Sequence, residues 1–269
     1  MREKIQVGVA CGKGSEGYVN FLLHTMKKTE SGKHDFEIIL GLSDSSVNVN
    51  KIQNKTLYDH IVVEVFDDES YGSLGHGKCL DGVFLKMNSR IGMIVDVDVA
   101  FLAKDWDLKM MSCLNDSCVM VGPEYMGEKY KNFPNVICCM FFVNPLKECE
   151  VSFVPSGKIV VSSEDSGLYG RKVGDVIHLD VGWETSYKLR KAGYTGLALP
   201  YARRIDSKGP VFSKVPPKFI EYNMRGEEYQ LNGEPLCTHI GRSSSRDFET
   251  NPIVRKWVST VENWVNNAL

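Results

Sequence analysis

Two aspartates at the end of an apolar run are the residues of this sequence best suited to chemistry. Asp96 and Asp98 follow the run Ile-Gly-Met-Ile-Val at residues 91–95. Side chains two positions apart on a strand project to the same side, and close carboxylates in low dielectric raise each other's energy unless something compensates them. Mg²⁺ or Mn²⁺ is the simplest compensation, because both prefer carboxylate oxygens and keep positions open for water and substrate phosphates. The pattern predicts a divalent-metal site suited to a nucleotide diphosphate; the alternative is a strand-end turn with capping carboxylates.

The spacing of this pair is informative only through its context. A second pair with the same spacing, Asp105 and Asp107, lies in a polar stretch and is expected to form a solvated turn or a helix start. Asp96 and Asp98, in contrast, follow an expected buried strand, and open α/β sheets bind their ligands at the carboxyl ends of strands.

The elements that must position the pair alternate between short apolar runs and amphipathic stretches, which is the pattern of a parallel sheet with crossover helices. Strands are expected at residues 5–10, 36–41, 60–65, 91–95, 119–122 and 136–143. Helices are expected along the stripe from Tyr18 to a stop at Ser31, over 75–87 and over 183–192. The predicted fold class is α/β, with a mostly parallel central sheet flanked by helices.

The remaining segments are of two kinds. Residues 156–175 and 201–230 are rich in Gly, Ser, Lys and Pro, so long irregular loops that order around a ligand are expected there. Residues 251–269 are expected to form a C-terminal helix capped by Asn251. Its apolar stripe favours docking on the rest of the chain; the alternative is a face for peripheral membrane contact or for an oligomer.

Composition and charge exclude several classes of protein. The chain has 269 residues, of which 43% are hydrophobic and 25% charged, so it is expected to fold around a sizeable core. Its 32 basic and 34 acidic residues give a formal charge of −2, which provides no general attraction for nucleic acid. No run approaches the roughly 20 apolar residues of a membrane-spanning helix. The eight cysteines contain no Cys-x-x-Cys and no secretory signal is recognisable, so reduced thiols and a cytoplasmic location are expected.

Several short motifs occur in a characteristic order. They are Asp35-Phe-Glu-Ile-Ile-Leu-Gly-Leu-Ser-Asp, Ser73-Leu-Gly-His-Gly-Lys, the Asp-Val-Asp strand end, Gly122-Pro-Glu, Asp180-Val-Gly-Trp-Glu and Thr238-His-Ile-Gly-Arg. In order and spacing they resemble the nucleotide-sugar glycosyltransferases of the A-type fold, above all family 2 and its relatives. The resemblance covers most of the chain. It implies one Rossmann-like domain over residues 1–269, with a nucleotide-sugar-binding half at 1–100, an acceptor-binding half at 101–250 and the C-terminal helix.

The resemblance also implies roles for individual residues. Asp98 resembles the metal-binding member of the family's acidic motif, and Asp96 resembles the member nearer the donor ribose. His239 resembles the late histidine that completes the metal shell. Asp44 resembles the acidic residue that holds the uridine or ribose of the donor, and its alternative role is to form a turn.

Three further residues are candidates for contacts with the donor. His76 and Gly77 belong to a loop that enters a helix, where backbone amides can approach the donor; a plain helix start is the alternative. Arg242 is a cation suited to a diphosphate, and the alternative is a solvated arginine.

Sugar transfer also needs a base for the acceptor hydroxyl. Asp180 and Glu184 lie four positions apart around a helix start, so both can face one side of the site. We expect Asp180 to be the base, because a side chain that precedes the helix can reach into a cleft; the alternatives are Glu184 as base and Asp180 as a helix cap. Trp183 is expected either to stack on a sugar or to pack in the core. The acceptor side and the core are likewise alternatives for three aromatic residues, Tyr125, Tyr130 and Phe133.

These expectations describe a metal-dependent, inverting hexosyl- or pentosyltransferase. Its cofactor would be Mn²⁺ or Mg²⁺, its donor a nucleotide-diphosphate sugar, and its acceptor a glycan or another hydroxyl compound. One alternative is a sugar nucleotidyltransferase. Enzymes of that class usually open with a Gly-rich basic phosphate loop, which the Gly-rich turn at residues 11–17 resembles weakly. The other is a protein of the same fold that binds a sugar nucleotide without catalysis.

Overall fold

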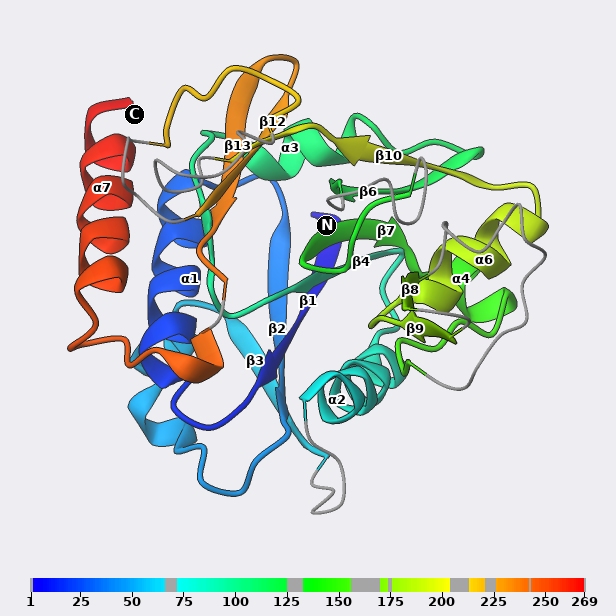
Figure 1. Ribbon diagram of the computed structural model, residues 1–269, viewed down its shortest axis with the longest axis horizontal. Coiled ribbons are helices and arrows are strands. Elements are labelled where there is room, and N and C mark those ends of the chain that lie inside the picture. Colours follow the sequence, from blue (N-terminus) through cyan, green and yellow to red (C-terminus); the bar gives the residue numbers. More distant parts are fainter. Residues whose placement is uncertain are drawn as a thin grey trace.

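A seven-stranded sheet forms the centre of the computed structural model, which describes residues 2–65, 72–124, 133–155, 170–173, 176–203, 213–220, 226–241 and 243–268. The strand order is β10-β6-β7-β4-β1-β2-β3 (Figure 1). The strands are β1 Lys4–Cys11, β2 Asp35–Leu42, β3 Asp59–Glu64, β4 Ile91–Val95, β6 Cys118–Pro123, β7 Cys138–Phe142 and β10 Thr195–Leu199. All neighbours run parallel except β7, which is antiparallel to both β4 and β6. The predicted α/β fold class with a mostly parallel sheet is confirmed.

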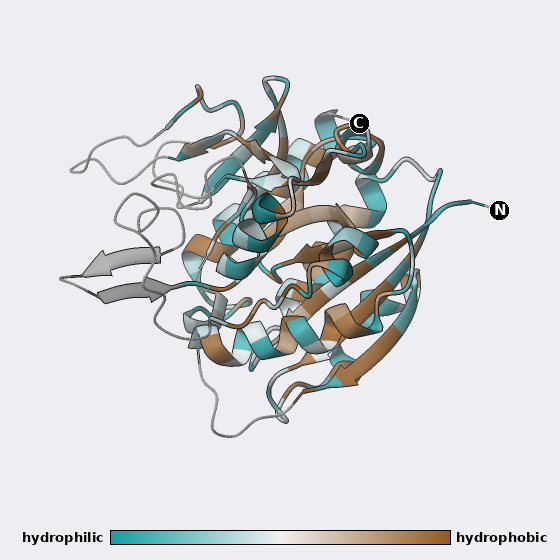
Figure 2. Ribbon diagram, turned by 90° about the vertical axis from the view of Figure 1, so that its right-hand side faces the viewer, coloured by the Kyte–Doolittle hydropathy of each residue, from teal (hydrophilic) through white to brown (hydrophobic). Residues whose placement is uncertain are grey.

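The central strands are apolar because both of their faces are buried. In β1, Ile5, Val7 and Val9 pack into one core, while Ala10 packs into the core on the opposite face. Alternate residues of a strand point to opposite faces, so a strand between two helix layers carries apolar residues at most positions rather than at alternate ones. Figure 2 shows the resulting concentration of brown ribbon in the central strands.

Helices cover both faces of this sheet. α1 (Glu16–Thr29) and α7 (Pro252–Ala268) lie side by side on one face, whereas α2 (Gly72–Lys86), α4 (Val143–Glu148) and α6 (Trp183–Lys191) pack on the other (Figure 1). The described residues also form α3 (Trp106–Met111) and three 3₁₀ turns, η1 Val49–Lys51, η2 Gln53–Leu57 and η3 Ser243–Ser245. α2 begins three residues before the expected start of its helix at residue 75.

A second sheet joins the first directly after β4. It is antiparallel, in the order β11-β12-β13-β5, with β5 at Val99–Phe101, β11 at Tyr201–Arg203, β12 at Glu227–Leu231 and β13 at Glu234–His239. A separate hairpin pairs β8 (Gly170–Val173) with β9 (Val176–Leu179). The expectation of irregular loops over 156–175 and 201–230 was therefore wrong at β8, β11 and β12; much of these two segments lies outside the described residues.

The C-terminal helix is docked on the protein, as expected from its stripe. Val254, Trp257 and Val261 are completely buried, and Trp257 Nε1 donates a hydrogen bond to Thr238 Oγ1 at 3.3 Å. Asn251 caps the helix, because its Oδ1 accepts from the Ile253 amide at 3.0 Å. Since the apolar stripe is buried, the structure gives no support to the alternative of membrane contact through this face. None of the helices within the described ranges combines the length and apolar character that crossing a membrane requires.

The second acidic pair does start a helix, but it is not solvated as a whole. Asp107 is completely buried at the beginning of α3 and accepts hydrogen bonds from the Ser31 amide at 2.8 Å and from His34 Nδ1 at 2.6 Å. The polar neighbours in the sequence did not reveal these partners, because they come from the turn between α1 and β2. Asp107 is thus a buried anchor for that turn.

Candidate metal centre

Three neighbouring parallel strands end at the same edge of the central sheet. The register aligns Cys11 at the end of β1 with Leu42 at the end of β2, and Val9 with Val95 at the end of β4. The loops that follow them, the start of α2 and the end of β13 surround a cavity of about 590 Å³, a volume typical of small-molecule sites. Polar residues that line it include Lys13, Ser15, Asp44, His76, Asp98 and His239.

The connection between the two sheets brings Asp98 and His239 together. The chain leaves β4 at Val95 and enters β5 at Val99, so the aspartate turn links the sheets. β13 pairs antiparallel with β5 and sets His239 opposite Val99. The Ile240 amide then donates to the Asp98 carbonyl at 3.1 Å. A pairing between distant segments therefore delivers an imidazole to the acidic turn.

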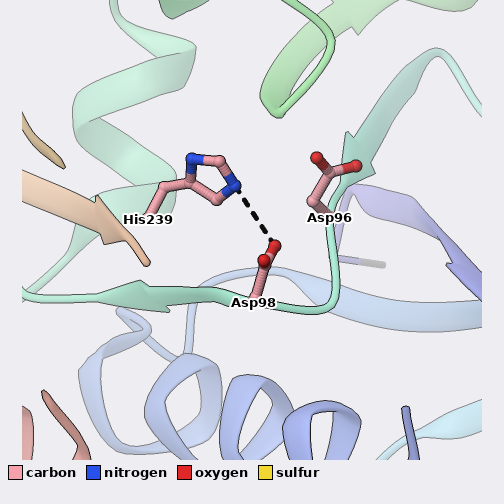
Figure 3. Close-up of side chains that lie close together, drawn as sticks. All are labelled: Asp96, Asp98 and His239. Atoms are coloured by element: carbon pink, nitrogen blue, oxygen red, sulfur yellow. Dashed lines mark ion pairs between the residues drawn. The ribbon is translucent and has the colours of Figure 1, made fainter. Parts of the chain in front are cut away.

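Asp96, Asp98 and His239 form a compact group of potential metal ligands. One ligand atom from each lies within 4.8 Å of the others, and their side chains converge on one space (Figure 3). Asp98 Oδ1 is 3.2 Å from His239 Nε2, and Asp98 Oδ2 accepts a hydrogen bond from the Ser243 amide at 3.2 Å. Asp98 is only 3% exposed, so its charge is held in a poorly solvated position.

These atoms fit a divalent cation. Asp96 Oδ1 is buried and accepts no hydrogen bond from the described residues, although His76 Nε2 lies 3.3 Å from it as an ion pair. A carboxylate oxygen without a hydrogen bond, a second carboxylate and an imidazole nitrogen make an oxygen-rich donor set of the kind that suits Mn²⁺ or Mg²⁺. The three residues offer one ligand atom each, which leaves further positions of such an ion for water or substrate oxygens.

The electrostatics of the group follow from burial and mutual contact. Burial by itself would raise the pKa of Asp98, but the His239 imidazole and the hydrogen bonds from Ser243 lower it below its usual value. Burial would lower the pKa of His239, but Asp98 and Glu227 on its two sides raise it well above its usual value. Without a metal, a proton on His239 thus compensates the buried carboxylates.

His76 and Gly77 occupy different surroundings within α2. His76 lines the cavity beside Asp96, and despite burial the Asp96 carboxylate raises the pKa of His76. Gly77 packs against the segment 153–155 instead: a Cβ there would lie 2.8 Å from the Phe153 carbonyl oxygen. Because α2 begins at Gly72, both residues are within the helix rather than in a loop before it, and their amides belong to its regular hydrogen-bond ladder.

Asp44 forms a turn and also lies at the edge of the cavity. It lines the cavity just after β2, and its Oδ1 accepts hydrogen bonds from the Ser46 amide at 2.8 Å and the Ser46 hydroxyl at 2.6 Å. These hydrogen bonds lower the pKa of Asp44. The turn thereby fixes an ionised carboxylate at the cavity edge.

Asp180 and Glu184 face different surroundings. Asp180 directly precedes the cavity residue Val181, accepts from the Val181 amide at 2.9 Å and contributes to the raised pKa of His76. Glu184 accepts from the Ser152 amide at 3.2 Å and pairs with Lys188 at 3.2 Å. Asp180 is therefore the one of the two that lies beside the cavity.

Trp183 and Phe133, the aromatic candidates within the described ranges, do not line the cavity. Trp183 is 3% exposed and Phe133 is 2% exposed, and both pack in the core around α2 and α6. The expectation that Trp183 stacks on a sugar is not supported, because its faces are covered by protein. Arg242, Tyr125 and Tyr130 lie outside the described residues.

Sequence reasoning did not assign a role to several residues around the cavity. Lys13 and Ser15 line it after β1, and the Gly-rich turn behind a buried strand was the signal that could have identified them. Ser243 lines it as well and binds Asp98. Glu227, which contacts His239 from behind, had no such signal, because its segment carries no apolar periodicity.

No protein-family model and no curated protein sequence matches the chain. Among solved structures, it is similar to the mannosyltransferase PcManGT from Pyrobaculum calidifontis in complex with GDP-Man and Mn²⁺, with 12% identity, a TM-score of 0.49 and coverage of 74% of this chain and 55% of that one. It is also similar to glucosyl-3-phosphoglycerate synthase from Mycobacterium tuberculosis in complex with Mn²⁺, UDP and glucosyl-3-phosphoglycerate (13% identity, TM-score 0.40, 54% and 58% covered). A third similar structure is S. aureus TarS 1-349 in complex with UDP (18% identity, TM-score 0.40, 57% and 50% covered).

The chain thus spans 50% to 58% of the length of these three structures. The mannosyltransferase belongs to the broad class that the sequence resembles, the glycosyltransferases. At these identities and TM-scores the similarity assigns neither an activity nor a substrate to this chain.

Proposed function

We propose that the protein is a metal-dependent glycosyltransferase that moves a sugar from a nucleotide-diphosphate sugar to a hydroxyl group of a glycan or another acceptor. The observation that carries the proposal is the convergence of Asp96, Asp98 and His239 on a cavity at the carboxyl ends of parallel strands. The group combines a buried carboxylate, a carboxylate oxygen without a hydrogen bond and an imidazole. Together these form a suitable binding site for a cation. The cavity beside them is large enough for a nucleotide sugar.

The donor would lie between the metal group and the loop after β1. Asp96, Asp98 and His239 would hold Mn²⁺ or Mg²⁺, which when bound supplies positive charge that stabilises the departing nucleoside diphosphate. Lys13 and the N-terminal end of α1 add positive potential on the cavity wall formed by that loop. Asp44 would accept hydrogen bonds from ribose hydroxyls or from the base. Most of the lining precedes residue 100, which supports a nucleotide-sugar-binding half at 1–100; acceptor binding by residues 101–250 stays a prediction from the sequence.

Asp180 would act as the base toward the acceptor. The acceptor oxygen bonds to the anomeric carbon as the bond from that carbon to the phosphate oxygen breaks, and the hydroxyl proton passes to the Asp180 carboxylate. A direct displacement of this kind inverts the anomeric centre and needs one base and no protein nucleophile. This assignment is supported by the position of Asp180, which directly precedes the cavity residue Val181 and contributes to the raised pKa of His76 in the cavity wall.

Product analysis tests the proposal. The protein is incubated with Mn²⁺ and a panel of UDP- and GDP-sugars, with and without candidate glycan acceptors, and nucleoside diphosphate is measured. We expect release of nucleoside diphosphate that depends on Mn²⁺ and rises with a suitable acceptor. A donor that binds, as seen by a raised melting temperature, but is never turned over with any acceptor would favour a binding protein without catalysis.

Sugar nucleotidyl transfer is a second candidate, and Lys13 is the observation that favours it. The lysine follows a buried strand within a Gly-rich turn and lines the cavity, as a residue that binds a nucleoside triphosphate would. Incubation with a nucleoside triphosphate and a sugar phosphate discriminates the two, because this reaction releases pyrophosphate. Pyrophosphate formation without nucleoside diphosphate release from sugar nucleotides would overturn the glycosyltransferase proposal.

A further inference from the structure

Glu227 stands directly behind His239 in the second sheet. The two residues are cross-strand partners of β12 and β13, and the next partner of Glu227, on β11, is Arg203. Glu227 Oε2 is 3.2 Å from His239 Nδ1, while His239 Nε2 is 3.2 Å from Asp98 Oδ1 on the opposite edge of the ring. The imidazole is therefore held between two carboxylates, one on each nitrogen.

The Glu227 carboxylate is itself fixed by two other side chains. Tyr229, two residues along the same strand face, donates its hydroxyl to Glu227 Oε2 at 2.6 Å. The Arg203 guanidinium lies 3.3 Å from Glu227 Oε1. The Tyr229 hydroxyl and the Arg203 guanidinium thus hold Glu227 with its Oε2 toward Nδ1 of His239.

A carboxylate can only accept hydrogen bonds, so it selects the form of the neutral imidazole that carries its proton on Nδ1. Nε2 then presents its lone pair toward Asp98 and Asp96. We propose that Glu227 is a positioning residue, which holds His239 in the orientation and tautomer that make Nε2 a metal ligand. Arg203 and Tyr229 in turn hold Glu227, so side chains of the second sheet fix the position of His239. This inference rests on the proposed metal site.

A double-mutant cycle with calorimetric Mn²⁺ titration tests the role of Glu227. Carboxylates that orient a metal-bound histidine typically contribute about 10- to 100-fold in metal affinity, so we expect a loss of about that size in Glu227→Ala. Glu227→Gln keeps an acceptor oxygen for Nδ1 and should lose less. In the His239→Ala background, Glu227→Ala should cause no further loss, because Glu227 acts through the imidazole.

The neighbouring carboxylate provides a matched control. Glu228 is completely buried on the opposite face of β12 and accepts hydrogen bonds from the Phe219 amide at 2.8 Å and the Ile220 amide at 3.0 Å. Glu228→Gln should lower the melting temperature of the metal-free protein and leave its Mn²⁺ affinity unchanged. A merely structural contribution of Glu227 would give this same pattern.

A comparison of two metal ions distinguishes the loss of His239 positioning from a general loss of negative charge near the metal site. Co²⁺ favours imidazole more than Mg²⁺ does, so Glu227→Ala should weaken Co²⁺ binding by a larger factor than Mg²⁺ binding. Unchanged Mn²⁺ affinity in Glu227→Ala, or additive losses in the cycle, would overturn the role of Glu227 while leaving the metal site intact. Failure of the wild-type protein to bind Mn²⁺ would overturn the metal site and the role of Glu227 together.

Discussion

Asp96 and Asp98 have unequal surroundings, although two positions separate them in the sequence. Asp98 is almost fully buried and bound by Ser243 and His239, whereas the side chain of Asp96 is 24% exposed and keeps a carboxylate oxygen without a hydrogen bond. Asp98 is therefore the fixed member of the pair, and Asp96 is the member that can adapt to a ligand. His76 lies beside Asp96 and can change its position together with Asp96 when a ligand binds.

Replacement of each candidate base, Asp180 or Glu184, by its neutral amide should affect the transfer rate differently. In Asp180→Asn the amide oxygen can still accept from the Val181 amide, so we expect intact donor binding. Transfer should fall by about 10²- to 10⁴-fold, because the proton acceptor is lost. Glu184→Gln, the matched control, should leave the turnover number nearly unchanged, since Glu184 binds Ser152 and Lys188. Full activity in Asp180→Asn combined with loss in Glu184→Gln would move the base to Glu184. Steady-state kinetics with calorimetric donor titration measure both effects.

The cysteines offer a prediction with a pH dependence. Burial raises the pKa of Cys79 to about 12, and thiolate is the reactive form, so the reactive fraction of that thiol at pH 8 is about 10⁻⁴ and rises tenfold per pH unit. The half-buried thiols are Cys113, Cys118 and Cys149, and the buried ones are Cys11, Cys79, Cys138, Cys139 and Cys237. Mass spectrometry after brief alkylation of the native protein should find label on the first set alone. Label on Cys79 at the rate of an unfolded peptide would contradict the burial of β2 against α2.

At the scale of elements, apolar runs predicted the central strands well. β1, β2 and β4 lie within one or two residues of their expected bounds, because a strand buried on both faces is apolar at most positions. The antiparallel direction of β7 was not predictable, since an apolar run is the same in either direction. β12 escaped prediction for a different reason: on one of its two buried faces the residues are the polar Glu228 and Gln230, which bind the loop at 216–220, so the strand shows no apolar alternation.

Gly77 allows helix α2 to pack closely against the segment 153–155. A Cβ at Gly77 would lie 2.8 Å from the Phe153 carbonyl oxygen and 2.8 Å from Val154 Cα, both of which are backbone atoms. Gly77→Ala should destabilise the protein by about 1–3 kcal/mol despite the better helix propensity of alanine. Gly226→Ala is the control, because the nearest atom to a Cβ there is 3.6 Å away. Urea denaturation measures both; equal stability of the two variants would contradict the close contact of α2 with residues 153–155.

At the scale of the whole molecule, the C-terminal helix α7 packs against both α1 and the second sheet. Trp257 is completely buried, its ring meets Phe21 of α1 edge-on at 5.3 Å, and its Nε1 binds Thr238 on β13. Trp257→Ala should therefore cost about 3–5 kcal/mol of unfolding free energy. Chemical denaturation checks this value. Exposed Ile253 on the same helix is the control, and Ile253→Ala should change stability by less than about 1 kcal/mol. Equal losses would mean that α7 is not docked through its stripe.

The acidic pair could be predicted from the local sequence, but its partners could not be predicted from residue spacing. Context within a few residues of Asp96 and Asp98 indicated a strand end, and that information is local. His239 meets Asp98 only because β13 pairs with β5, and Glu227 meets His239 only because β12 pairs with β13. Such pairings join distant parts of the chain, so spacing along the sequence does not contain them. The resemblance to glycosyltransferases suggested His239, whereas nothing suggested Glu227.

The most direct test of the metal centre is calorimetric titration of Mn²⁺, with and without a nucleoside diphosphate, into three forms of the protein. We expect the wild type to bind one Mn²⁺, with higher affinity when the diphosphate is present, and Asp98→Asn to lose this binding while keeping its fold. Asp105→Asn makes the same chemical change at a left-handed residue outside the cavity, a conformation that asparagine tolerates, and should bind as the wild type does. Equal Mn²⁺ affinity in wild type and Asp98→Asn would contradict the account.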